Sequence, residues 1–219
     1  MTNKTNRKND NDINQEDDEI CEAAFLFEIG CYHLQEKNWE VAITAFTSVI
    51  EIEPGIAFVY DRRGVACGGM ERYDEAIADF NQAINIDPTF DGAYNNRGLS
   101  YYKKYQFDEA IADYDRAIQL SPDIAVFYAN RGLAYRWKED YVLAIKDFDK
   151  AIDLAPDLSE THENRGEIYA ILGEHEKAIA DFDRELEINP NNMNAFASRA
   201  TILDEMNNNT KKSYRKKNK

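Results

Sequence analysis

The amino-acid sequence predicts an all-α fold of stacked helix pairs, and three observations lead to this class. The 219 residues contain only five prolines, and each lies 34 residues after the last: Pro54, Pro88, Pro122, Pro156 and Pro190. Apolar residues recur at intervals of three and four, as on one face of a helix. No window shows the two-residue alternation of a β-strand. A fixed period of this length indicates a repeat array rather than one or two globular domains.

The period divides the chain into five complete repeats, which cover residues 23–56, 57–90, 91–124, 125–158 and 159–192. Residues 193–206 begin a sixth repeat and stop after its first half, so we expect a capping helix there. An acidic segment over 1–22 and a basic tail over 207–219 flank the array, and we expect both to be disordered because they are strongly polar.

Each repeat carries two helical patterns, as the third repeat illustrates. Two sets of residues each fall on one helical face: Tyr94, Arg97, Gly98 and Tyr101, and then Ala110, Tyr114 and Ala117. We expect Asp108 to be the N-cap of the second helix. Pro122 should end that helix, because proline has no amide donor and restricts the residue before it.

Small and large residues alternate with the period. Glycine recurs in the middle of each first helix, at Gly30, Gly64, Gly98, Gly132 and Gly166. An aromatic residue recurs in each second helix, at Phe46, Phe80, Tyr114, Phe148 and Phe182. Glycine inside a helix is less favourable than alanine by about 0.5–1 kcal/mol. Its repetition therefore indicates that another helix comes close at this place.

At these residues the sequence resembles the tetratricopeptide repeat family. The pattern stands as YNNRGLSYYKKYQFDEAIADYDRAIQLSP in the third repeat and YANRGLAYRWKEDYVLAIKDFDKAIDLAP in the fourth. The resemblance covers residues 23–206 and implies a right-handed superhelical solenoid of antiparallel helix pairs, with the first helices lining its concave face. The fifth repeat departs from the pattern: His162 and His175 replace aromatic residues and Glu185 replaces a small residue. We expect these changes to loosen its packing.

A second pair of residue types varies together along the array. Arginine stands in the first helix at Arg63, Arg97, Arg131, Arg165 and Arg199, and aspartate in the second helix at Asp79, Asp113, Asp147 and Asp181. The first repeat has neither, since it carries Ile29 and Ala45. A half-buried guanidinium needs an acceptor, and a carboxylate matches its geometry. We infer an Arg–Asp pair at the packing surface, either within a repeat or between neighbours.

Charge and composition exclude several classes of partner and location. The formal net charge is −15, and an array this acidic repels phosphate backbones, which argues against nucleic-acid binding by the array. We find no apolar stretch near the roughly 18 residues of a membrane span, and no secretory signal. The three cysteines lack metal-site spacing and are expected to be reduced thiols. A cytoplasmic location follows.

No enzyme signature is visible in the sequence. Gly64, Gly68 and Gly69 resemble a phosphate-binding loop only superficially, because no strand precedes them and no Gly-Lys-Ser/Thr follows. His33 lies two residues from Cys31, but the other histidines are far away in the array. We see no Ser/His/Asp constellation. We therefore expect a non-enzymatic protein without a metal or cofactor.

The candidate binding residues lie on the first helices. One group is a series of amides, Asn96, Asn130 and Asn164, which can both donate to and accept from a peptide backbone. The alternative is that these amides were copied with the repeat and face water. The other group comprises Phe58, Val65, Leu99, Tyr102, Leu133 and Trp137, with Arg136 on the same face. Apolar grooves mark partner sites, although Trp137 packing under the neighbouring turn is an equal alternative.

These residues predict a protein-interaction module that binds a partner peptide or helix in the concave groove. Resemblance to co-chaperone members would imply a Lys, Arg and Asn clamp for an acidic C-terminus. Here Asp61 stands with Val65 and Glu163 with Glu167, so an acidic chaperone tail is not expected. The alternative is an assembly scaffold or self-associating subunit that uses the array ends and the convex face. The basic tail is either a tether to anionic surfaces or a solvated end.

Overall fold

The fold is helical throughout the part of the chain that the computed structural model describes, which is residues 10–217, with side chains over 20–208. Residues 10–217 contain no strand, so the predicted all-α class is confirmed. The chain divides into two compact units, Met1–Tyr105 and Gln106–Lys219, and each is described by itself. The division falls inside the third expected repeat.

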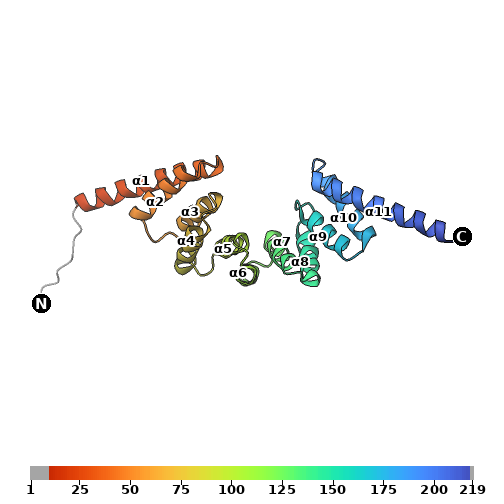
Figure 1. Cartoon of the computed structure of the whole chain (residues 1–219). Helices are drawn as coiled ribbons and strands as arrows, with labels where there is room; N and C mark the ends of the chain where they lie inside the picture. The colour runs from red at the N-terminus through yellow and green to blue at the C-terminus, as the bar shows by residue number, and fades with distance from the viewer. Residues whose placement is uncertain (1–9, 218–219) are drawn as a thin grey trace. The chain divides into compact units, whose positions relative to one another are not determined.

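The first unit contains five of the described helices. They are α1 (Asp10–Gln35), α2 (Trp39–Ile52), α3 (Ala57–Gly69), α4 (Tyr73–Ile86) and α5 (Asp91–Lys103). Helices α1 and α2 pack as one pair and α3 and α4 as the next, and α2 contacts α3 while α4 contacts α5 (Figure 1). Successive helix pairs therefore stack as repeats in this unit.

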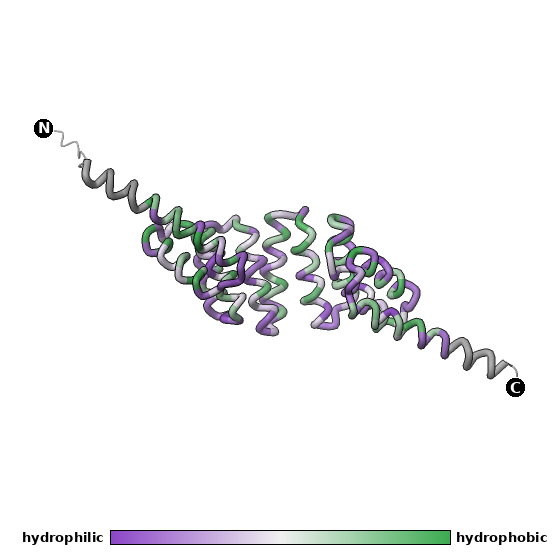
Figure 2. The backbone as a smooth tube through the Cα atoms, turned by 90° about the horizontal axis from the view of Figure 1, so that it is seen from above, coloured by the Kyte–Doolittle hydropathy of each residue, from purple (hydrophilic) through white to green (hydrophobic). Residues whose placement is uncertain are grey.

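The second unit contains the remaining described helices. They are α6 (Phe107–Leu120), α7 (Ala125–Trp137), α8 (Tyr141–Leu154), α9 (Thr161–Ile171), α10 (His175–Ile188) and α11 (Met193–Lys217). Helix α7 pairs with α8 and α9 with α10, and α11 packs on α10. Figure 2 shows hydrophobic and hydrophilic residues alternating along these helices, as amphipathic packing requires.

The prolines end the second helices as predicted. The residue before each proline is the C-cap of the preceding helix: Glu53, Asp87, Ser121, Ala155 and Asn189. Proline excludes the α conformation from the residue before it, so the helix ends there. Asp108 is not an N-cap, and this prediction is wrong. Gln106 is the N-cap of α6, without a side-chain cap, and Asp108 lies in the first turn, where a carboxylate interacts favourably with the helix dipole.

The turn within each helix pair passes through the left-handed region. The residues with positive φ there are Lys37, Glu71, Tyr105, Glu139 and Gly173. In four of these turns the next amide donates to a carbonyl five residues back, as from Arg72 to Cys67 at 3.0 Å and from Asp140 to Tyr135 at 2.9 Å. This bond belongs to the Schellman motif, which satisfies the last carbonyls of a helix. Each turn is therefore defined by backbone bonds, and only one of them uses glycine.

The Arg–Asp pair inferred from the sequence is present within a repeat, and the same arginine also contacts a second aspartate, in the preceding repeat, that was not predicted. Arg131 donates from Nε and Nη2 to Asp147 of its own repeat, both at 2.7 Å, and from Nη1 to Asp115 of the preceding repeat at 2.5 Å. Arg165 contacts Asp181 and Asp149 in the same way. Each of these two guanidinium groups therefore joins three helices.

The long terminal helices extend into segments that we expected to be disordered. Helix α1 begins at Asp10, and α11 continues to Lys217. Each grows out of a packed part of the chain, and elongating an existing helix needs no new nucleus. Residues 1–9 and 218–219, which belong to the same expectation, lie outside the described residues.

Candidate functional site

The predicted binding residues fall in both units. Helices α3 and α5 of the first unit carry five of them: Phe58, Val65, Asn96, Leu99 and Tyr102. Helices α7 and α9 of the second unit carry the other five: Asn130, Leu133, Arg136, Trp137 and Asn164. Each unit therefore carries its own candidate binding surface.

In the first unit, Val65, Asn96 and Leu99 line one pocket of about 300 Å³. Its other lining residues come from α2, α3, α4 and α5: Trp39, Gly64, Gly68, Gly69, Tyr73, Phe80, Ser100 and Lys103. Leu99 is 40% exposed, so the pocket opens to solvent at this side chain. A concave, mostly apolar pocket with a few polar groups is typical of a binding site.

The glycines of α3 open this pocket, which the sequence alone did not reveal. A Cβ atom on Gly68 would meet no heavy atom within 4 Å, whereas the equivalent positions in the next two repeats carry Tyr102 and Arg136. A Cβ atom on Gly69 would lie 2.7 Å from the Trp39 ring. Gly69 therefore makes room for Trp39, and Gly68 leaves empty the space that a larger residue fills elsewhere. The sequence does hold a signal for the pocket. The residue at this position of the repeat is much smaller in the second repeat (Gly68) than in the third and fourth (Tyr102 and Arg136).

A buried carboxylate organises the polar side of the first unit. Asp61 is fully buried and accepts from Nε and Nη2 of Arg62 at 3.0 and 2.6 Å. It also accepts from Nδ2 of Asn96 at 2.8 Å. The Asn96 amide thus joins α5 to α3, and one of its N–H groups is already used. From the sequence, Asp61 was noted only as a departure from the clamp, and its contact with Asn96 was not predicted.

Phe58 belongs to an aromatic group beside a second apolar pocket. Its ring centroid lies 5.9 Å from Phe27 and 6.1 Å from Phe90, and the Arg62 guanidinium lies 4.6 Å over the ring. Phe27 and Phe58 help to line a pocket of about 320 Å³ that reaches Ile20. Phe58 is 45% exposed. The apolar surface predicted for the first helices is therefore present at this end of the chain.

In the second unit, Arg136 and Asn164 contact each other. Arg136 donates from Nη1 to Oδ1 of Asn164 at 2.7 Å and forms an ion pair with Glu167. Asn164 in turn donates to the backbone carbonyl of Glu160 at 2.7 Å. Burial raises the pKa of Glu167, while Arg136 opposes this shift and Glu163 adds to it. A polar pocket of about 510 Å³ adjoins these residues.

The other predicted residues of α7 have mixed surroundings. Trp137 stacks on Phe107 with centroids 6.1 Å apart and still has 57% of its surface exposed. Trp137 therefore packs on a neighbouring ring in part, and its role in partner binding stays a prediction. Leu133 packs against the buried cluster that contains Phe148, so it supports the core. Tyr102 and Asn130, each half-buried, make further contacts of their own.

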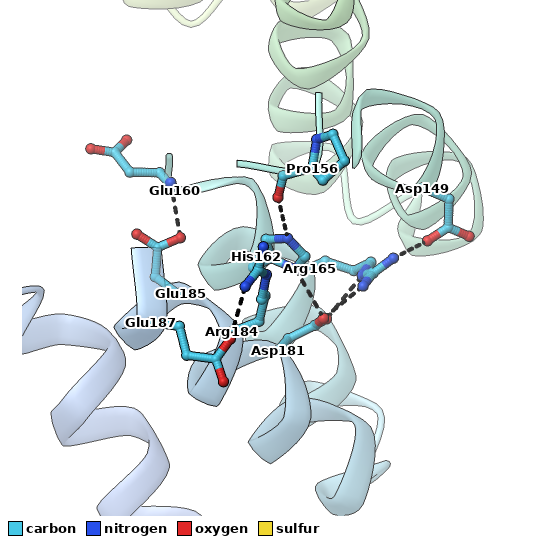
Figure 3. A network of polar contacts seen from close by, with 9 residues as sticks. All are labelled: Asp149, Pro156, Glu160, His162, Arg165, Asp181, Arg184, Glu185 and Glu187. Carbon is cyan, nitrogen blue, oxygen red and sulfur yellow. Dashed lines mark hydrogen bonds and ion pairs between the residues drawn. The ribbon is translucent and has the colours of Figure 1, made fainter. Parts of the chain in front are cut away.

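The fifth repeat adds a polar network to its apolar core, in which His162, Asp181 and Glu185 are buried (Figure 3). Nε2 of His162 lies 3.0 Å from the carbonyl oxygen of Pro156. In the preceding repeat, the equivalent Tyr128 donates from its hydroxyl to the carbonyl oxygen of Pro122, also at 3.0 Å. Nδ1 of His162 lies 3.5 Å from Asp181. Burial by itself opposes ionisation of Asp181, but hydrogen bonds from His162 and Arg165 outweigh it, so the pKa of this carboxyl lies below its usual value.

This lowered pKa predicts a specific pH dependence of stability. The folded pKa of Asp181 lies below its unfolded value, so the ionised group stabilises the fold above the unfolded pKa, and this stabilisation is lost as the pH falls through the folded pKa. We expect the unfolding free energy of the natural protein to fall more steeply below about pH 4 than that of Asp181→Asn. Urea unfolding followed by circular dichroism measures both slopes. Asp157→Asn, at an exposed position, is the control, and equal slopes for the natural protein and Asp181→Asn would contradict the prediction.

Asn192 attaches the last helix to the fifth repeat. Its Nδ2 donates to Glu163 at 2.6 Å and to the fully buried Glu185 at 3.1 Å. Its Oδ1 accepts from the amides of Asn194 and Ala195, both at 3.1 Å, at the start of α11. Glu185 occupies a position where the preceding repeats carry a small alanine. Its buried carboxylate accepts a hydrogen bond from Asn192, whereas the alanine makes only apolar contacts.

We expect Asn192→Asp to lower the unfolding free energy by about 1–3 kcal/mol, although aspartate is an equally good N-cap. The change keeps the acceptor for α11 but removes the donor to Glu163 and Glu185 and adds a third carboxylate beside them. Asn194→Asp is the control, because it places the same charge at an exposed position in the first turn of α11, where the effect should stay within about 0.5 kcal/mol. Urea unfolding of both variants checks this, and equal stabilities would refute it.

The described residues show neither a metal cluster nor a membrane span. Among the side chains that the structure describes, over residues 20–208, no group of three or more His, Cys, Asp or Glu residues is arranged to hold a metal ion. No helix over residues 10–217 is both long and apolar enough to cross a bilayer.

Comparison with solved structures shows the fold. PilF of Pseudomonas aeruginosa is 18% identical over 90% of this chain and 88% of its own, with a TM-score of 0.78. YrrB, described as a tetratricopeptide repeat protein with an unusual peptide-binding site, is 20% identical over 80% of this chain and 90% of its own, with a TM-score of 0.64. The first repeat domain of Spaghetti (RPAP3), bound to the HSP90 peptide SRMEEVD, is 28% identical over 53% of this chain and 92% of its own, with a TM-score of 0.52.

Comparison with protein families gives the assignment. A search of curated protein sequences found no match. The TPR repeat family model matches residues 70–104, and the tetratricopeptide repeat model matches 92–124, 125–158 and 159–192. Together these matches cover more than half of the chain. The helix pairs, the proline-terminated second helices and these matches agree: the chain belongs to the tetratricopeptide repeat family.

Proposed function

We propose that this protein is a non-enzymatic interaction module that holds an extended peptide or a helix of a partner protein against its first helices. The observation that carries the proposal is the open apolar pocket between α3 and α5, bordered by the exposed side chain of Leu99. Exposed apolar surface on a folded domain marks a protein-binding site. YrrB and the RPAP3 domain, which are similar in fold, are described with peptide sites, and this supports the same class of ligand here.

The proposed ligand is not an acidic C-terminal chaperone tail. The RPAP3 domain is bound to a peptide that ends in EEVD. In this chain the corresponding places carry Asp61 with Val65 in α3 and Glu163 with Glu167 in α9. None of these four side chains is the Lys, Arg or Asn of the clamp, so a cluster of acidic side chains has no complementary partners at these places. We also propose a cytoplasmic location, in keeping with the three free cysteines.

A display library of peptides from the protein's own proteome tests the proposal. We expect enrichment on the natural chain to be lost in Leu99→Lys, because a buried ammonium in the apolar pocket is unfavourable. Val142→Lys is the matched control, since Val142 is 82% exposed and lies on α8, the second helix of the fourth repeat, away from the pocket. Circular dichroism verifies that both variants remain helical. Enrichment that persists in Leu99→Lys would contradict the proposal.

Self-association through the N-terminal end is the second candidate function. Phe25 is 64% exposed and Ile20 is 55% exposed, and Ile20 lines the apolar pocket that contains Phe27 and Phe58. If this surface joins two copies, the natural protein is an oligomer in light scattering and Phe25→Glu is a monomer. A monomeric natural protein at micromolar concentration would remove this candidate.

A further inference from the structure

The pocket opened by Gly68 has a shape and a charge that specify what enters it. We propose that it receives one bulky apolar side chain, aromatic or leucine-like, of a partner peptide that carries a carboxylate within one or two residues of that side chain. This inference rests on the proposed function, because it names a side chain of the same peptide. It adds the chemistry of the ligand and the residue that selects it.

The volume of the pocket and the missing side chain at Gly68 indicate the size of the group that binds there. The pocket of about 300 Å³ is bounded by the rings of Trp39, Tyr73 and Phe80 and by Val65 and Leu99. Its volume is at the lower end of ligand pockets, which suits one side chain rather than a whole ligand. Gly68 stands where the equivalent residues of the following repeats are Tyr102 and Arg136, so a large side chain is already accommodated at this place of the fold.

The charge of the occupant follows from Lys103. Among the pocket-lining residues only Lys103 carries a formal charge, and its side chain is exposed. Within the described part of the chain, Lys103 forms no ion pair, whereas its neighbour Lys104 contacts Asp74. The nearby acid Asp61 is fully buried and already paired with Arg62. An ammonium group that borders an apolar pocket without a partner complements a carboxylate on the bound peptide.

The polar residues of the pocket do not compete for this carboxylate. The Ser100 hydroxyl donates to the backbone carbonyl of Asn96 at 3.1 Å, and the Asn96 amide donates to Asp61. The Ser100 hydroxyl is therefore used within α5, and one N–H of the Asn96 amide is used between α5 and α3. The net negative charge of the chain does not prevent the contact, because exposed charges more than about 8 Å apart are largely screened at physiological salt.

Methyl NMR of the full chain tests the proposal with three capped dipeptides. We expect Ac-Phe-Glu-NH2 to shift the methyl signals of Val65 and Leu99. Ac-Ala-Glu-NH2 should bind at least about tenfold more weakly, because it lacks the side chain that fills the pocket. Ac-Phe-Lys-NH2 should bind about two- to fivefold more weakly, as the loss of one exposed ion pair implies.

Two variants separate the pocket from its rim. Gly68→Tyr fills the pocket with the residue found one repeat later and should abolish the shifts. Gly55→Tyr is its control, since Gly55 also has open space around it but lies outside the pocket. Lys103→Glu leaves the pocket open and should reverse the preference between Ac-Phe-Glu-NH2 and Ac-Phe-Lys-NH2.

Unmoved Val65 and Leu99 signals with Ac-Phe-Glu-NH2, or equal shifts in Gly68→Tyr, would overturn the inference. The outcome is independent of the peptide screen. Methyl shifts together with a screen that Leu99→Lys does not change would support the pocket and overturn the proposed function. A screen that depends on Leu99 together with silent methyl signals would overturn the pocket alone.

Discussion

Arg131→Leu is expected to lower the unfolding free energy by about 3–5 kcal/mol, because removing one partner of a buried ion pair leaves the other charge unsatisfied. Asp147 is only 4% exposed and accepts two of the Arg131 hydrogen bonds. The same guanidinium contacts Asp115 on the preceding helix pair. One substitution therefore leaves a buried carboxylate without its donors and removes the tie between α6, α7 and α8.

Urea unfolding followed by circular dichroism measures this loss. Arg184→Leu is the matched control, because Arg184 is also paired twice, with Asp157 and Glu187, but lies at the surface. The loss in Arg184→Leu should be much smaller, because solvent-exposed ion pairs contribute little to stability. Arg131→Leu combined with Asp147→Leu should recover most of the stability, since apolar residues often replace a buried pair without loss. A single variant as stable as Arg184→Leu would show that the pair contributes little.

The period of the sequence predicted most of the fold. Proline excludes the α conformation one residue earlier whatever surrounds it, so the ends of the second helices were readable at Pro88 and Pro122. The N-cap prediction at Asp108 was wrong because α6 already begins at Phe107, so Asp108 has helical backbone inside the first turn and cannot be the residue that precedes it. The partners of Arg131 were predicted by residue type, but its contact with Asp115 depends on how neighbouring pairs stack.

The candidate site was less predictable than the fold, because the pocket is a space that exists where a side chain is missing. Leu99 and Val65 were selected as exposed apolar residues, and both line the pocket. Gly68 was set aside as part of an unlikely phosphate loop, although its missing side chain creates the space. The amides were selected for their ability to bind a peptide backbone. Asn96 and Asn164 also make contacts within their own units, to Asp61 and to Arg136, which a sequence without coordinates does not reveal. Their peptide-binding role stays a prediction.

The effect of Gly64→Ala on the unfolding free energy is expected to change sign when Phe80 is replaced by alanine. This sign change tests the close packing of the glycine against the aromatic ring. A Cβ atom on Gly64 would lie 2.7 Å from the ring of Phe80, which is 2% exposed. Alone, Gly64→Ala should therefore destabilise the chain by about 1–3 kcal/mol through overpacking. Phe80→Ala alone should destabilise it by about 3–5 kcal/mol, because it leaves a cavity beside the glycine.

In the Phe80→Ala background the ring is gone, and only the helix propensity of the residue at position 64 remains. Gly64→Ala should then stabilise the protein by about 0.5–1 kcal/mol. Gly68→Ala in the same helix is the control, because its Cβ would meet no atom within 4 Å, and it should stabilise both backgrounds alike. Unfolding free energies of the four combinations at positions 64 and 80 decide the matter. A Gly64→Ala effect of the same sign in both backgrounds would mean that the close approach of Phe80 is not the reason for glycine at this place.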